Sequence, residues 1–251
     1  MDLGTQGAWD SPQMLLAFGS PDAPDSLKES SSHLPNTGIP DDVVYLSDVD
    51  ERANTLTHGL GTVLSLAAAA WFWEITQDET LGLRLSCLVF CLSMFTVYFF
   101  STLSHAVKSP AARNRLRSWD QGTIYLLISG TYSPFVWQGS PDGWRNILMF
   151  SIWIAAAAGF YSKVLAKHRV NAVSTWSYLL LGWLPAIPLV QRTPSVCVWG
   201  MIAGGVSYTI GVVFLINSSR FRFSHAIWHL WVMIGSAWHC WAIYRLAQMT
   251  D

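Results

Sequence analysis

Two histidines near the end of the chain have the spacing of paired metal ligands. His225 and His229 are four residues apart, so on a helix both imidazoles lie on one face, one turn from each other. Two imidazoles placed in this way can bind one zinc ion. The same spacing is typical of histidines that hydrogen-bond to a neighbouring helix. The pair alone therefore leaves both interpretations open.

Two other ionisable side chains border apolar segments and favour the metal interpretation. His105 ends one such segment and Asp120 begins the next, while Ser101 precedes His105 by one helical turn. Three imidazoles near a carboxylate form the ligand set of a catalytic zinc site, in which the fourth position is left to water. We therefore predict Zn²⁺ as the cofactor, with His105, His225 and His229 as its ligands.

The predicted catalytic residues are Asp120 and Ser101. A zincin has a glutamate directly after its first histidine, whereas Ala226 follows His225 in this chain. Asp120 is the only carboxylate placed to act as the general base, taking a proton from the water that the metal activates. Ser101 would hydrogen-bond to that water or orient a ligand.

Two further histidines are expected to have other roles. His58 has Glu51 and Asn54 near it in the sequence, and we predict that it makes a structural contact or orients a ligand. His239 lies ten residues beyond His229, which is about 15 Å along a helix. That distance is too long for a shared metal, so we predict a place in the core or at the membrane interface.

The composition predicts that a membrane bundle positions these side chains. Hydrophobic residues make up 51% of the 251 positions and charged residues 12%, about half the charged fraction of a soluble domain. The apolar segments are continuous, unlike the alternating strands of a β-barrel, and each has the roughly 20 residues that a spanning helix needs. The predicted fold is an all-α bundle of seven transmembrane helices, at residues 54–74, 83–105, 120–138, 144–162, 172–190, 195–216 and 225–246, with a kink at Pro134 in the third.

The basic residues predict the orientation of the bundle, because Lys and Arg near span ends stay in the cytoplasm. The opposite side shows only Arg84, Arg145, Arg192 and Arg245. We predict a cytoplasmic N-terminus and an external C-terminus, which puts the proposed zinc site at cytoplasmic helix ends. This bias also accounts for the basic cluster, so no nucleic-acid partner is expected. The connections on the N-terminal side hold nine basic residues: Lys108, Arg113, Arg115, Arg117, Lys163, Lys167, Arg169, Arg220 and Arg222.

Residues 1–48 differ from the rest of the chain. The first 50 residues contain nine acids against the single Lys28, and they include no long apolar run. We predict a disordered acidic extension at 1–48, without a secretory signal, and a transmembrane domain at 49–251. The four cysteines lie inside apolar runs, without the spacing of a zinc ribbon or a disulfide framework. They are predicted to be buried free thiols.

Four motifs follow one another along the apolar part of the chain. They are Glu51-x-x-Asn54-x-x-Thr57-His58-Gly59, Ser101-x-x-x-His105, Asp120-x-x-x-Ile124 followed by Gly130-Thr131-Tyr132-Ser133-Pro134-Phe135, and His225-Ala226-Ile227-Trp228-His229-Leu230. With these motifs the chain resembles the hemolysin III family, the bacterial relatives of the progestin and adipoQ receptors. The resemblance covers about Val49 to Leu246.

The resemblance implies a seven-helix protein of the bacterial inner (plasma) membrane with zinc near the cytoplasmic face. In the family the site is formed by a serine and a histidine of the second helix, an aspartate of the third and two histidines of the seventh. The wider superfamily includes alkaline ceramidases, which implies hydrolysis of a lipid amide or ester. The corresponding residues here are Ser101, His105, Asp120, His225 and His229.

Three functions remain open at this point. The first is zinc-dependent hydrolysis of a membrane lipid, whose acyl chain would enter between helices. The second is a receptor or regulator of the membrane in which zinc is structural. The third, implied by the family name, is a lytic protein, although the predicted spans show no repeated ring of polar residues that would line a conduit.

Overall fold

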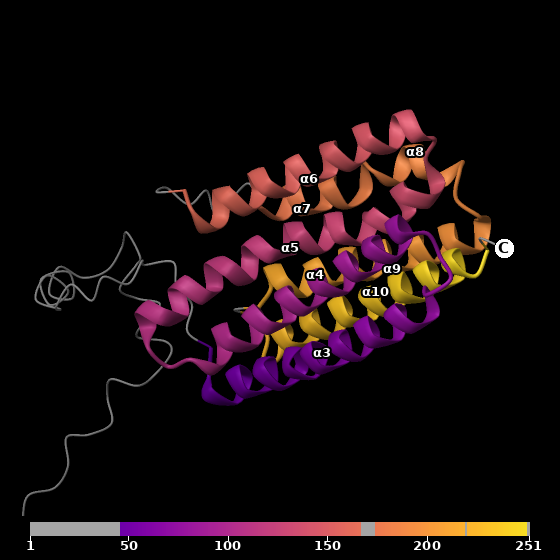
Figure 1. Cartoon of the computed structure of the whole chain (residues 1–251). Coiled ribbons are helices and arrows are strands. Elements are labelled where there is room, and N and C mark those ends of the chain that lie inside the picture. The colour runs from indigo at the N-terminus through magenta and orange to yellow at the C-terminus, as the bar shows by residue number, and fades with distance from the viewer. Residues whose placement is uncertain (1–45, 167–173, 219, 250–251) are drawn as a thin grey trace, which may run out of the picture. The chain divides into compact units, whose positions relative to one another are not determined.

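The chain is helical throughout the region that the structure, a computed structural model, describes, namely residues 46–166, 174–218 and 220–249. The described helices all belong to one unit, Val44–Asp251. Figure 1 shows how they lie alongside one another. The helices are α3 (Asp48–Ile75), α4 (Leu81–Ala106), α5 (Pro110–Gly139), α6 (Asp142–Val164), α7 (Ser174–Trp183), α8 (Ala186–Val190), α9 (Ser195–Ile216) and α10 (Ser224–Ala247).

Local sequence signals explain where the first helices begin. The Ser47 hydroxyl accepts a hydrogen bond from the Asp50 N–H, and the Thr80 hydroxyl accepts one from the Leu83 N–H. Both are N-caps that satisfy backbone donors left free in a first helical turn. Pro110 begins α5, where its missing N–H costs nothing. The cap at Ser47 sets the phase of α3, whose buried face begins with the polar residues Glu51, Asn54 and His58.

The packing of the bundle relies on close helix contacts. α4 packs against α3 and α5, α10 packs against α9 and α3, and α5 packs against α6. At Gly130 of α5 the backbone approaches α4 so closely that a Cβ atom would lie 2.8 Å from Cβ of Ser93. Small residues of this kind let helices approach in membranes, where apolar burial provides no driving force.

The outer surface has the character expected in lipid. Within the described residues, four helices are long and apolar enough to cross a membrane, namely α3, α4, α6 and α9, and Trp176–Val190 forms a shorter apolar stretch. Large apolar side chains on these helices point outward, where water would disfavour them. They include Leu60, Val63, Phe150, Ile154 and Trp199. The predicted all-helical membrane protein is confirmed in this respect.

Two predicted spans differ from the observed helices. α5 begins at Pro110, so Asp120 lies almost three turns inside the helix, where we expected it to begin one. The predicted span 172–190 is divided into α7 and α8 at Leu184 and Pro185, because proline has no N–H to continue the helix. α5 accommodates its own Pro134 without interruption. Residues 172 and 173 lie outside the described region.

Two other predictions concern the acidic extension at residues 1–48 and the four cysteines. The predicted disorder falls on residues 1–48, of which 1–45 lie outside the described region, and α3 already begins at Asp48. The cysteines are free, as predicted. Three of them are buried, and Cys240 is only partly buried.

Gly130→Ala should lower the thermal stability of the protein, because the added methyl group collides with Ser93. Overpacking of this kind typically costs about 1–3 kcal/mol. The melting temperature in detergent would be measured beside Gly182→Ala, where a Cβ meets nothing within 4 Å. The double variant Gly130→Ala, Ser93→Gly should recover most of the loss. Equal melting of the Gly130 and Gly182 variants would contradict this packing.

Candidate metal centre

Three histidines converge where α4 ends and α10 begins. His105 lies in the last turn of α4, and His225 and His229 lie in the first two turns of α10. One nitrogen of each ring lies within 4.8 Å of the corresponding nitrogens of the other two. His105 and His229 are buried, and His225 is partly exposed. The structure thus brings together the three residues that the sequence predicted as ligands.

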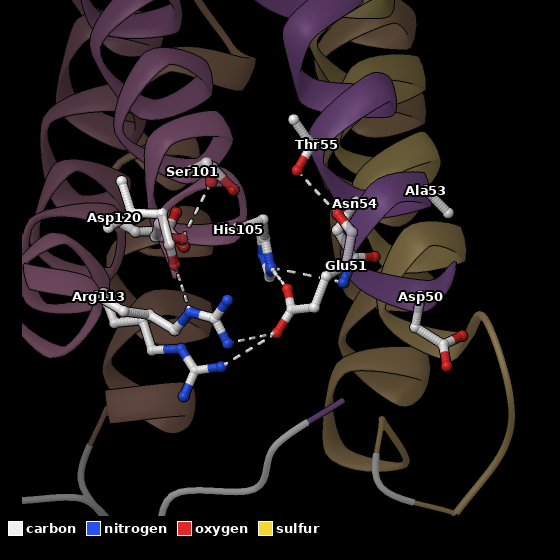
Figure 2. Close-up of polar contacts among 12 residues, drawn as sticks. Asp50, Glu51, Ala53, Asn54, Thr55, Ser101, His105, Arg113 and Asp120 are labelled. Atoms are coloured by element: carbon white, nitrogen blue, oxygen red, sulfur yellow. Dashed lines mark hydrogen bonds and ion pairs between the residues drawn. The ribbon is translucent and has the colours of Figure 1, made fainter. Parts of the chain in front are cut away.

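The orientation of His105 is set by Glu51 of α3. The Glu51 Oε2 atom lies 2.5 Å from Nδ1 of His105 and accepts its proton, as Figure 2 shows. Nδ1–H is thereby occupied, and the lone pair of Nε2 remains available. Nε2 is buried and has no hydrogen-bond partner within the described part of the chain. A metal-binding histidine typically makes this kind of contact to a carboxylate.

Glu51 is itself held by two arginines of α5. Nη1 of Arg113 lies 3.4 Å from Oε1 of Glu51, and Nη2 of Arg117 lies 3.6 Å from the same oxygen. Only 6% of Glu51 is exposed, and a carboxylate so deeply buried needs opposite charges and hydrogen-bond donors around it. The two guanidinium groups thus stabilise the buried carboxylate and hold it in position beside His105.

The orientation of His229 is set by a second residue of α3, Thr57. Its Oγ1 lies 3.0 Å from Nδ1 of His229 and also 3.0 Å from the carbonyl oxygens of Ala53 and Asn54. The hydroxyl donates to the carbonyls, so it accepts the proton of Nδ1. The second nitrogen of His229 is then free to bind a metal, as in His105.

His58 packs against one of the three histidines. Its ring stacks on His229, with 3.5 Å between ring centroids and an interplanar angle of 11°, and it also contacts Tyr98. Both ring nitrogens are buried without a hydrogen-bond partner among the described residues. The stacking is a structural contact to a predicted ligand, which is the kind of role that the sequence predicted for His58.

Asp120 and Ser101 lie beside the three histidines without joining them. The Ser104 hydroxyl donates to Oδ2 of Asp120 at 3.2 Å. The Ser101 hydroxyl is buried next to Asp120 but lies outside hydrogen-bond geometry with any described residue. Asp120 is absent from the group of three histidines. Its predicted role was that of a general base and not of a ligand.

Asp120 and His58 also line an apolar cavity of about 100 Å³. The cavity runs between α5, α7, α8, α9 and α10, from these two residues to His239. His239 is buried beside the ring of Tyr208 and is not part of the ligand group, consistent with the predicted core position. Other residues that line the cavity are Leu127, Tyr178, Trp183, Met201 and Val232.

The donor set fits a zinc ion. It consists of three imidazoles, a ligand type that zinc accepts readily, and the buried lone pair of His105 Nε2 has no other use in the described structure. The sequence did not predict the supporting residues Thr57, Ser104, Arg113 and Arg117 or the contact between Glu51 and His105. The signal available for the two residues of α3 was the Glu51-x-x-Asn54-x-x-Thr57 spacing, which places polar side chains one turn apart along that helix.

Comparison with known proteins gives a consistent result. The family described as Haemolysin-III related matches residues 47–240. Hemolysin-3 of Bacillus cereus is 35% identical over 194 residues, covering 75% of this chain and 87% of that protein. The Hemolysin-3 homolog of Bacillus subtilis (strain 168) is 32% identical over 201 residues, covering 75% and 90%. The human monocyte to macrophage differentiation factor is 24% identical over 201 residues, covering 78% and 84%.

Thr57→Val should weaken zinc binding, because Nδ1 of His229 loses the acceptor that fixes its tautomer. Removal of such a supporting contact typically reduces metal affinity about 10- to 100-fold. Affinity would be measured by competition with a chromophoric chelator. Thr55→Val is the matched control, since Thr55 also bonds to a carbonyl one turn before it, that of Glu51, but contacts no histidine. Equal affinities of the two variants would contradict the role of Thr57.

Proposed function

The chain belongs to the haemolysin-III-related family, and from this premise we propose that it is a membrane enzyme that uses zinc to hydrolyse a lipid amide or ester. One observation carries the proposal. A group of three histidines lies beside a carboxylate, Asp120, that also lines an apolar cavity. A metal site with access to an apolar chain suits a substrate that is drawn from the bilayer.

The proposed topology has seven spans. α7 and α8 together form one span, and each of the other six helices forms one: α3, α4, α5, α6, α9 and α10. α5 and α10 carry polar residues on their buried faces, as expected where helices line a site. The bias of Lys and Arg supports a cytoplasmic N-terminus and an external C-terminus, in the plasma membrane of a bacterium.

The proposed chemistry divides the work among residues on different helices. A zinc ion held by His105, His225 and His229 supplies a Lewis acid and an activated water. Asp120 accepts the proton of the attacking water and later returns it to the leaving group. Ser104 holds the carboxylate of Asp120 in place, and the apolar cavity excludes bulk water from the reacting carbonyl.

A second candidate function is that of a receptor or regulator with structural zinc. The observation in its favour is that the ligands come from two helices, α4 and α10, which a metal would join. Three protein ligands favour the enzyme instead, since structural zinc sites almost always have four. A lytic activity, suggested by the names of the Bacillus relatives, ranks below both.

Asp120→Asn should keep the metal and lose activity, because the amide has a similar shape but cannot accept the proton. Loss of a general base typically reduces the rate about 10²- to 10⁴-fold. Zinc content and fatty acid released from ceramides and phospholipids would be measured by mass spectrometry on one preparation. Asp142→Asn, at an exposed acid paired with Arg145, is the control. Zinc loss in the Asp120 variant would make Asp120 a ligand, and unchanged turnover would remove its catalytic role.

A reporter enzyme fused after Asp251 should be active only outside the cytoplasm. The reason is that an odd number of spans separates the two termini in the proposed topology. A second reporter, one that works only in the cytoplasm, should be active when placed after Val107, before α5. Cytoplasmic activity of the C-terminal fusion would show that the span count or the orientation is wrong.

A further inference from the structure

A second pocket, polar in character, reaches the metal centre from the end of the bundle where α3 and α10 begin. Its volume is about 250 Å³, and it is separate from the apolar cavity. His225 lines it, so one residue belongs both to this pocket and to the ligand group. The remaining walls come from the start of α3 and the connection before α10, with Ser47, Asp50, Asn54, Ser218, Arg220 and Arg222.

Phe223, the residue that precedes α10, is held in a defined conformation in one wall of the pocket. Phe223 has φ 59°, in the left-handed region that a bulky residue rarely adopts. Its N–H donates to Oδ1 of Asp50 at 2.9 Å, and the other carboxylate oxygen of Asp50 accepts a hydrogen bond from Ser47. Both oxygens of Asp50 are therefore occupied, and the pocket wall is fixed to α3.

Unused polar groups in this pocket indicate its ligand. Asn54 is fully buried, and its Oδ1, a hydrogen-bond acceptor, has no partner in the described part of the chain, so it can accept from a headgroup hydroxyl but makes no bond to a phosphate oxygen. Arg220 and Arg222 are exposed, and neither forms an ion pair with any described residue. With Asp50 they give the pocket a net charge of about +1 at neutral pH. Guanidinium groups are suited to phosphate, to which they can donate two hydrogen bonds at once.

The walls of the two pockets include different residues around the histidine group, His58 and Asp120 in the apolar cavity and Asn54 and His225 in the polar pocket. We propose that the polar pocket binds the phosphate headgroup of a lipid through Arg220 and Arg222, while the acyl chain of that lipid occupies the apolar cavity. The reacting carbonyl then lies between them. This inference rests on the proposed function in placing a reaction there, and it names phospholipids as the substrate class.

The test measures binding to zinc-depleted protein, so that its outcome does not depend on turnover. The probes are 1-oleoyl-lysophosphatidylglycerol, the neutral 1-oleoylglycerol with the same chain, and sn-glycerol 3-phosphate without a chain. Retention of each would be followed by native mass spectrometry. The variant is Arg220→Gln, Arg222→Gln. The control is Lys108→Gln, Arg115→Gln, which removes two exposed charges that do not line the pocket.

The wild type should bind the anionic lipid about tenfold more tightly than the neutral lipid, as expected for hydrogen bonds to a charged group. The Arg220, Arg222 variant should lose this preference, and the control should keep it. Equal binding of the two lipids by the wild type, or an unchanged preference in the variant, would overturn the proposal. Glycerol phosphate that bound as tightly as the lipid would also overturn it, because the pocket would then serve a free anion. If the wild type prefers the anionic lipid but releases no fatty acid, the headgroup site stands and only the proposed enzymatic function is contradicted.

Discussion

The arrangement of the site depends on one constraint, that each buried candidate ligand must donate one ring N–H to an acceptor so that its other nitrogen is free. For His105 and His229, which are buried, α3 supplies both acceptors. Glu51 accepts from His105 and Thr57 accepts from His229. The two residues are six positions apart and reach two different helices. The first span thus contributes no ligand, yet it decides how the ligands point.

The same constraint gives a structural role to two arginines at the start of α5. A buried carboxylate is costly unless opposite charges surround it, and Arg113 and Arg117 meet Glu51 from the first two turns of α5. This contact connects α3, α4 and α5 through a single carboxylate. The packing of these three helices and the geometry of the candidate metal centre therefore depend on the same carboxylate, that of Glu51.

The sequence predicted the three-histidine group because each member has a position that periodicity determines, four residues apart or at the end of an apolar run. It did not predict the partner of Glu51, since contacts between helices depend on rotation about their axes, which hydropathy does not encode. The start of α5 was also missed. Hydropathy marks where a helix enters lipid, whereas Pro110 begins that helix three turns earlier. The division at Pro185 was overlooked because a proline near other apolar residues does not lower hydropathy.

Part of the apolar cavity is built from helices that supply nothing to the metal centre. α7 and α8, interrupted at Pro185, line the cavity but carry none of the three candidate ligands or their acceptors. Substitutions in this interrupted segment can therefore change the width and length of the cavity while the histidine group stays intact. Under the proposed function, such modularity would let a lineage diversify the lipids it accepts without first losing its reaction, and it concentrates evolutionary freedom in one segment of the chain.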